Sequence, residues 1–140
     1  MCGIAGIVSK NSSLINKDRI ESATKCLKHR GPEGEGIWIN EEKTMALGHL
    51  RLRIIDLSHE AAQPMHCFGR YSIVHNGELY NYIEIRQELL KKGYPFNSQS
   101  DTEVIVAAYD LWGTDCLQQF DGMFAFAIWD QKEKKLFAAR

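Results

Sequence analysis

The apolar positions of this chain are spaced mostly as in β-strands. The opening run over residues 2–9 is nearly all small and apolar, which predicts a buried strand at the start of the fold. Further apolar and alternating runs predict strands at residues 37–40, 43–48, 50–55, 70–75, 123–129 and 136–140. We expect the first two of these to form a hairpin, and Asn76-Gly77 to break the strand that precedes it. Residues 58–68 have no regular spacing.

Helical spacing of apolar residues separates these strands. It predicts helices over residues 18–29, over residues 82–92, and from the capping box at residues 100–103 to Gly113. Gly93 occupies the usual C′ position after the second helix, and a short helix through Leu117 follows the third.

The chain is predicted to form one domain over residues 1–140, since it has no repeats, low-complexity segments or linkers. Residues 29–36 form a glycine-rich loop that lacks the spacing and the trailing lysine of a phosphate-binding loop. The last predicted strand stops abruptly at Arg140, which suggests a fragment of a longer protein.

Composition narrows the classes of function. With 140 residues, 44% hydrophobic and 25% charged, the sequence is typical of a globular domain. Its net charge of −1 argues against nucleic-acid and membrane partners, because those surfaces attract a basic face. A signal peptide and a membrane-length apolar run are both missing, so we expect a cytoplasmic protein.

The four cysteines predict neither disulfides nor a metal site. They stand far apart in the sequence and form no C-x-x-C pair. His59, His66 and Cys67 are the best candidate ligands, but a fourth ligand at suitable spacing is missing. Ordinary polar loop positions explain these residues equally well, so we expect no metal.

Cys2 is the residue with the clearest chemical potential. Removal of Met1 would leave a thiol nucleophile and a free α-amine on one residue, with no partner histidine needed. An α-amine titrates near pH 7.7–8.0, so roughly a third of it is unprotonated at pH 7.5 and able to act as a base. A small core residue in an apolar first strand is the competing interpretation.

Three other segments carry groups that such a nucleophile could use. Asn76 and Gly77 offer a side-chain amide and a backbone N–H, the paired donors that a tetrahedral oxyanion needs, although Asn-Gly is also a common hairpin turn. Arg51 offers a fork for a substrate carboxylate, or is simply a solvated strand residue. Asp101 could pair with a substrate ammonium, although the first turn of a helix favours an acid in any case. Together, the four groups would describe a site that cleaves the side chain of an α-amino acid.

Seven ordered segments resemble one known family. They read M-C-G-I-A-G-I, H-R-G-P-E, G-H-L-R-L-R-I-I-D-L, A-A-Q-P-M, H-N-G-E-L-Y-N-Y, S-D-T-E-V-I and G-M-F-A-F-A-I-W-D. Their order and wording are similar to the class II (N-terminal nucleophile) glutamine amidotransferase domain, and most similar to the glutamine-hydrolysing asparagine synthetase branch. The likeness extends from Met1 to Arg140. It implies an α+β fold, a four-layer α/β/β/α sandwich with two antiparallel sheets, here truncated at its C-terminal end.

The resemblance also implies roles for single residues. Cys2 would be the nucleophile, with its freed α-amine as the base, and Asn76 and Gly77 would form the oxyanion hole. The glutamine would be held by substrate-binding residues on three segments, namely Arg51, Ile54, Ile55, Asn76, Glu78 and Asp101. The loop at residues 29–36 and the neighbourhood of Arg51 resemble segments that close over bound glutamine.

The implied reaction is hydrolysis of L-glutamine to glutamate and ammonia through a thioester on Cys2. No cofactor is expected in this domain. In the full-length protein, a C-terminal synthetase domain would use ATP and Mg²⁺ to join the ammonia to aspartate, and a homodimer remains open. Two alternatives stand beside this prediction: the same glutaminase with a sugar, sugar phosphate or phosphoribosyl acceptor, or a non-catalytic relative with a structural role.

Overall fold

Two antiparallel β-sheets form the centre of the computed structural model, which describes residues 2–52, 55–56 and 58–140. The first sheet has the order β1-β3-β2, with β1 at Gly3–Val8, β2 at Gly34–Ile39 and β3 at Met45–Arg51. The second has the order β4-β5-β6-β7, with β4 at Met65–Cys67, β5 at Tyr71–Leu79, β6 at Gly122–Asp130 and β7 at Lys135–Ala139.

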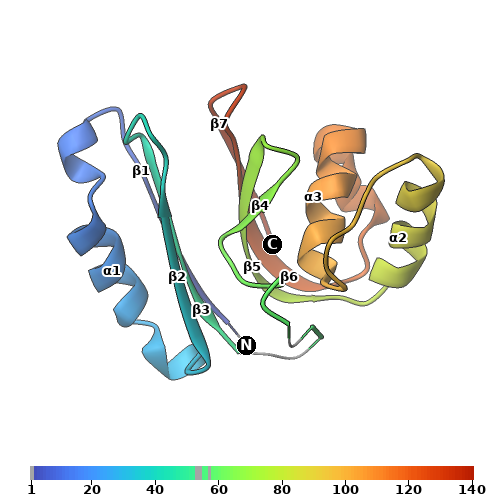
Figure 1. Ribbon diagram of the computed structural model, residues 1–140, viewed down its shortest axis with the longest axis horizontal. Coiled ribbons are helices and arrows are strands. Elements are labelled where there is room, and N and C mark those ends of the chain that lie inside the picture. Colours follow the sequence, from blue (N-terminus) through green and yellow to red (C-terminus); the bar gives the residue numbers. More distant parts are fainter. Residues whose placement is uncertain (1, 53–54, 57) are drawn as a thin grey trace.

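Helices cover the outer face of each sheet. Helix α1 (Lys17–Lys25) lies on the first sheet, and α2 (Tyr82–Lys91) and α3 (Asp101–Trp112) lie on the second (Figure 1). Three short 3₁₀ helices, η1 (Ser12–Leu14), η2 (Lys28–Arg30) and η3 (Gly113–Gln119), connect these elements. The layers therefore follow the order helix, sheet, sheet, helix, which confirms the four-layer α/β/β/α prediction.

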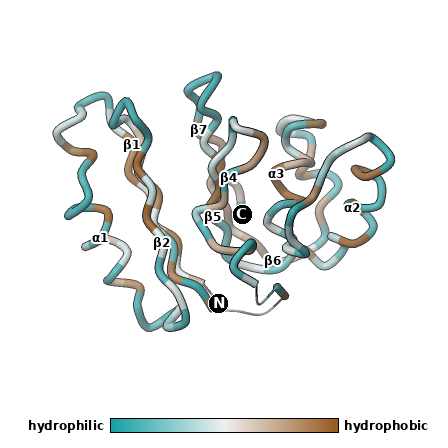
Figure 2. Tube along the Cα trace, viewed as in Figure 1, coloured by the Kyte–Doolittle hydropathy of each residue, from teal (hydrophilic) through white to brown (hydrophobic). Residues whose placement is uncertain are grey.

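The core has three layers: one between the two sheets, and one between each sheet and the helices on its outer face. Met45, Leu47, Val74 and Trp129 pack between the sheets. A larger cluster, which includes Ile73 and Phe126, lies between the second sheet and helices α2 and α3. Neighbouring residues of a strand point to opposite faces, so β5 fills one layer with Val74 and the other with Ile73. Brown, apolar segments accordingly lie along β1 and in helix α3 (Figure 2).

The N-terminus of α3 is fixed by the predicted capping box in a modified form. The Ser100 side chain accepts a hydrogen bond from the Thr102 N–H at 3.1 Å, as an N-cap should. Glu103 reaches further back, and its carboxylate accepts from the N–H groups of Asn97 and Ser98 at 2.9 and 2.8 Å. The loop that leads into α3 is thereby held in place from its inner side.

Several element boundaries differ from the sequence prediction. The predicted helix at residues 18–29 ends at Lys25 and is followed by the separate turn η2. Of the predicted strand at residues 50–55, Leu50 and Arg51 are the last residues of β3, and residues 53–54 lie outside the described part of the chain. The short strand β4 falls within residues 58–68, for which no strand was expected. Its pairing with β5 imposes strand structure where local spacing gives no signal.

Asn76-Gly77 does not break the strand, contrary to the prediction. Strand β5 continues through it to Leu79, and Gly77 pairs with Phe124 of β6. Gly77 has φ +138°, a conformation that side chains rarely adopt. Pairing with a strand distant in the sequence therefore overrides the local turn signal.

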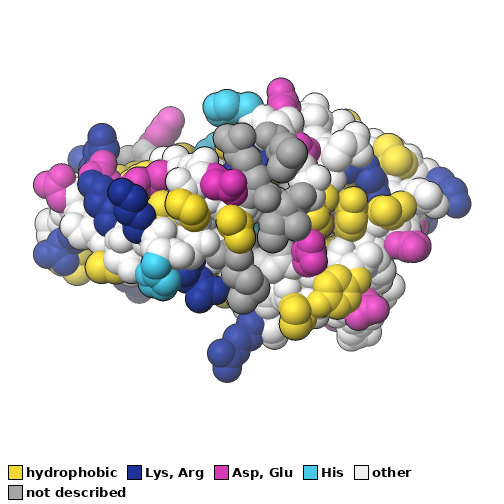
Figure 3. Space-filling view, turned by 90° about the horizontal axis from the view of Figure 1, so that it is seen from below, with side chains coloured by type: hydrophobic (Ala, Val, Ile, Leu, Met, Phe, Trp, Pro, Cys, Tyr) yellow, Lys and Arg dark blue, Asp and Glu magenta, His cyan; other side chains and the backbone are white. Residues whose placement is uncertain are grey.

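Surface charge and helix length are the features that would indicate a nucleic-acid or membrane partner. Acidic and basic side chains are interspersed on the face shown in Figure 3. Among the helices in the described part of the chain, none is both long and apolar enough to cross a bilayer.

Candidate active site

A cavity of about 200 Å³ opens at the end of the two sheets where β1 begins. Its lining comes from the start of β1, the end of β3 and the segment after it, strand β5, and the first turn of α3. Six of the residues predicted from the sequence line it: Cys2, Arg51, Ile55, Gly77, Glu78 and Asp101. Groups that are up to a hundred residues apart in the sequence thus surround one space.

Two of the predicted residues are missing from this set, for different reasons. Asn76 is not among the cavity residues, although its neighbour Gly77 is. Strand alternation places the Asn76 side chain on the same face of β5 as Val74, which packs between the sheets. The Asn76 Oδ1 atom is buried and has no hydrogen-bond partner in the described part of the chain. Ile54 lies outside the described residues.

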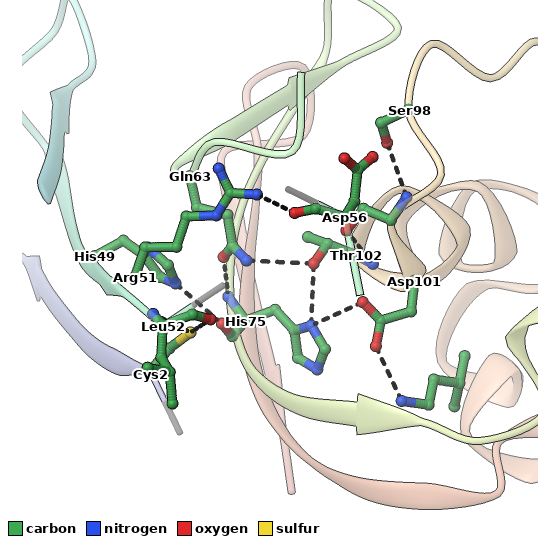
Figure 4. A network of polar contacts seen from close by, with 12 residues as sticks. Cys2, His49, Arg51, Leu52, Asp56, Gln63, His75, Ser98, Asp101 and Thr102 are labelled. Carbon is green, nitrogen blue, oxygen red and sulfur yellow. Dashed lines mark hydrogen bonds and ion pairs between the residues drawn. The ribbon is translucent and has the colours of Figure 1, made fainter. Parts of the chain in front are cut away.

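The Cys2 thiol is half-buried and is held by the end of β3. The Leu52 N–H donates to Cys2 Sγ at 3.3 Å, and the thiol donates back to the Leu52 carbonyl oxygen at 3.5 Å (Figure 4). Arg30 Nε donates to the Cys2 carbonyl oxygen at 3.1 Å. A backbone N–H at this distance is placed to stabilise negative charge on the sulfur. The Arg30 contact could not be predicted from the sequence, because an arginine in a glycine-rich loop is usually solvated.

Position 77 requires glycine because of the neighbouring strand and the backbone conformation. A Cβ atom at this position would overlap the carbonyl oxygen of Met123 on the neighbouring strand β6, and the positive φ would strain any side chain. Gly77 also lines the cavity, so its backbone borders the space that a substrate would occupy. This is the backbone that the sequence analysis assigned to the oxyanion hole.

Arg51 is buried, which contradicts the alternative of a solvated strand residue. Its side chain is 8% exposed, and its guanidinium donates to the carbonyl oxygens of Ser58, at 2.9 Å, and Asp56. These two bonds use two of the five N–H donors of an arginine, and a bidentate grip on a carboxylate needs two more. The same bonds fix the direction of the fork along the cavity wall.

Asp101 is a buried carboxylate in the first turn of α3. It is 5% exposed, and its Oδ2 accepts from the Leu79 N–H at 3.0 Å. Burial raises the pKa of Asp101, while the N–H groups of Leu79 and Thr102 act in the opposite direction. A cation entering the cavity would relieve this cost of burying a negative charge.

A buried polar network behind the cavity was missed at the sequence level. The His75 N–H donates to Gln63 Oε1 at 2.6 Å, Gln63 Nε2 donates to Thr102 Oγ1 at 3.2 Å, and that hydroxyl lies 3.0 Å from His75 Nδ1 (Figure 4). The three bonds close a ring that joins β5 to α3. Gln63 and His75 both lie in segments that carried the family resemblance, but no spacing rule pairs them.

Two histidines, His75 in this ring and His49 beside it, are neutral at pH 7. Burial lowers the pKa of His49 and that of His75 to about 4. His75 Nδ1 lies 3.9 Å from Asp101 Oδ1, but a neutral ring supplies no full positive charge there. The carboxylate of Asp101 is therefore not balanced by the imidazole beside it.

Two of the residues considered as metal ligands, His66 and Cys67, have other roles in the fold. His66 Nδ1 lies 2.9 Å from Ser72 Oγ, and burial raises the pKa of Cys67 to about 12. No group of three histidine, cysteine, aspartate or glutamate residues suited to a metal ion occurs within the described residues.

Comparison with known proteins places these features in a family. The family described as "Glutamine amidotransferase domain" matches residues 1–140. Asparagine synthetase (glutamine-hydrolyzing) 3 of Bacillus subtilis (strain 168) is 41% identical over 144 residues, which cover 100% of this chain and 23% of that protein. Putative asparagine synthetase (glutamine-hydrolyzing) 2 of Methanocaldococcus jannaschii is 39% identical, over 100% of this chain and 30% of that protein.

Solved structures agree on the fold. A glutamine phosphoribosylpyrophosphate amidotransferase from B. subtilis, in complex with ADP and GMP, superposes with a TM-score of 0.66 at 24% identity. The superposition covers 93% of this chain and 35% of that one. The whole-length family match and the identities near 40% agree with the motifs that surround the cavity, and the chain belongs to the glutamine amidotransferase domain family.

Proposed function

We propose that this chain hydrolyses L-glutamine to glutamate and ammonia in the cavity that begins at Cys2. The observation that carries the proposal is the gathering of a thiol, a buried guanidinium and a buried carboxylate around one space of about 200 Å³. An α-amino acid presents a carboxylate, an ammonium and a side chain in three directions, and these three groups are their chemical complements.

Arg51 and the acids fix the substrate before reaction. The Arg51 fork binds the α-carboxylate, and Glu78 and Asp101 receive the α-ammonium. The Asp101 carboxylate has lost water by burial, so an ammonium beside it restores the charge balance that a neutral His75 does not provide. Ile55 lines the wall along the chain of the substrate.

The chemical step takes place on the side-chain amide. The Cys2 sulfur attacks the amide carbon, and the oxygen develops negative charge that the Asn76 side-chain N–H and the Gly77 N–H stabilise. The α-amine of Cys2, free once Met1 is removed, takes the thiol proton and passes it to the departing ammonia. Water then hydrolyses the glutamyl thioester and releases glutamate.

The reaction that consumes the ammonia would take place in a protein longer than this chain. The chain spans 23% and 30% of the length of the two curated relatives described above. Their names support aspartate as the acceptor, rather than a sugar, a sugar phosphate or a phosphoribosyl group. We therefore propose that a C-terminal synthetase domain with ATP and Mg²⁺ converts the ammonia and aspartate into asparagine in the cytoplasm, and that the glutaminase part needs no cofactor.

Kinetics of glutamine hydrolysis tests the assignment of roles. Cys2→Ala should abolish hydrolysis, and substantial residual activity would refute the mechanism. Arg51→Ala should mainly raise KM, because the carboxylate contact is felt equally in the ground state and the transition state. Asn76→Ala should lower kcat by about 100-fold or more, because its contact forms in the transition state. Equal effects of both changes on KM would contradict the oxyanion role.

The α-amine has a separate test. A chain that retains Met1, or that carries any N-terminal extension, should be inactive while its fold is intact by circular dichroism. Full activity with a blocked terminus would show that another group is the base.

A further inference from the structure

Asp56 joins two parts of the cavity wall that are distant in the sequence. Its Oδ1 accepts from the Ser58 N–H and its Oδ2 from the Gln99 N–H, both at 2.8 Å. Its backbone carbonyl oxygen accepts from Arg51 Nη2. One residue thus contacts the arginine fork through its backbone (Figure 4) and the loop before α3 through its side chain.

The second contact matters because of where Gln99 lies. Gln99 is two residues before Asp101, on the loop that leads into α3. Asp56 therefore links the Arg51 side of the cavity wall to the loop that leads to Asp101. Hydrogen bonds between a carboxylate and backbone N–H groups are among the stronger ones in proteins and have well-defined directions. This bond limits how far the two sides can move apart.

Asp56 is ionised at neutral pH. The hydrogen bonds from Ser58 hold the pKa of the Asp56 carboxyl below its usual value, with smaller contributions from the Gln99 N–H and the Arg51 charge. Both carboxylate oxygens are thus available as hydrogen-bond acceptors at neutral pH.

We propose that Asp56 is a positioning residue that sets the distance between the carboxylate-binding Arg51 and the ammonium-binding Asp101, and so selects ligands that carry both charges of an α-amino acid. This proposal rests on the proposed function, because it assigns Asp56 a part in holding glutamine. Asp56 itself touches neither end of the substrate in this account.

The loop before α3 has a second anchor, which makes the proposal testable in a folded protein. Glu103 accepts from the N–H groups of Asn97 and Ser98 and from the Ser98 hydroxyl at 2.7 Å. Removal of the Asp56 contact therefore leaves the loop attached to α3. Only its link to the Arg51 side is lost.

Two variants separate the side chain's shape from its charge. Asp56→Asn keeps the shape but replaces one acceptor oxygen with an NH₂ group, which cannot accept from the facing backbone N–H. Asp56→Ala removes both acceptors. Asp115→Asn, at an exposed position in η3, makes the same change of charge away from the cavity and is the matched control.

The experiment compares two reagents on the same thiol. A diazo-ketone analogue of glutamine needs both ends of the site, whereas iodoacetamide needs only a reactive Cys2. Peptide mapping is required because Cys26 is exposed and can react with iodoacetamide as well. In both Asp56 variants, the labelling rate with the analogue should fall about tenfold, and the rate with iodoacetamide should stay within about twofold of the unmodified chain. The KM for glutamine should rise in parallel while kcat changes little, and Asp115→Asn should match the unmodified chain throughout.

Each other outcome counts against the proposal. An unchanged rate with the analogue would show that Asp56 does not position the site. An equal fall with both reagents would show that its role is merely structural. If the unmodified chain reacts with iodoacetamide at Cys2 but never with the analogue, the proposed function fails and this inference fails with it. If the analogue labels the unmodified chain and labels the Asp56 variants at the same rate, only the positioning role is refuted.

Discussion

The two buried histidines make the stability of this protein depend on pH in a defined window. His49 and His75 are 1% and 2% exposed, and burial lowers the pKa of each from 6.5 to about 4. In the unfolded chain each would return to its ordinary value. Between pH 6.5 and pH 4 the unfolded state therefore binds more protons than the folded state, so stability must fall as the pH falls through this window.

The magnitude follows from the two pKa values. A histidine that titrates at about 4 when folded and at about 6.5 when unfolded loses about 2 kcal/mol of stability between pH 7 and pH 5, and about 3 kcal/mol by pH 4. Two such residues together give about 4 kcal/mol between pH 7 and pH 5, a large part of the stability of an ordinary domain. Asp101, whose pKa is raised by burial, acts in the opposite direction nearer pH 4.

Urea unfolding followed by circular dichroism at pH 7, 6 and 5 measures this loss. His75→Gln removes one titrating ring and leaves a side chain that can bond to Thr102, so it should halve the fall in stability across that range. His29→Gln, in the short turn η2, is the matched control and should leave the slope unchanged. A total loss below about 1 kcal/mol, or parallel profiles for the unmodified chain and His75→Gln, would refute the argument from burial.

Three other substitutions test two residues that line the cavity and one that contacts Cys2. Gly77→Ala should lower the free energy of unfolding by at least about 2 kcal/mol, because backbone overlap adds to the strain of positive φ. Gly93→Ala is the control, because φ there is +89° but the space is open, and it should cost only about 1 kcal/mol in the same urea titration. Asp101→Asn should raise the KM for glutamine about tenfold or more with a smaller effect on kcat, and an unchanged KM would remove it from the ammonium site. Arg30→Ala should lower kcat about tenfold with an intact fold, because Cys2 loses a contact that orients it; a normal kcat would show that the contact is dispensable.

The sequence predicted most of the strands from local signals, and it predicted the site residues from the motifs of the family resemblance. Apolar runs identified β1 and β6, and the capping box identified the start of α3. Six of the eight predicted site residues line one cavity, since the motifs that carried the resemblance are the segments from which its walls are built. Their catalytic and binding roles remain predictions.

The contacts that hold these residues were beyond local reasoning. β5 continues through Asn76-Gly77 because β6, more than forty residues later, supplies its pairing partner. The closed ring of Gln63, His75 and Thr102 joins three segments with no common period. No spacing rule links such groups, because hydrogen bonds between segments depend on tertiary packing, which also buries Arg51 and gives Asp56 its position.

The most direct test of the central claim is to trap the covalent intermediate. Acid quenching of the protein during turnover of glutamine, followed by peptide mapping in a mass spectrometer, should reveal a glutamyl group on Cys2, and Cys2→Ala should carry none. Hydrolysis of glutamine without any adduct at Cys2, or with the adduct on another cysteine, would contradict the assignment of this cavity as a glutamine site with Cys2 as its nucleophile.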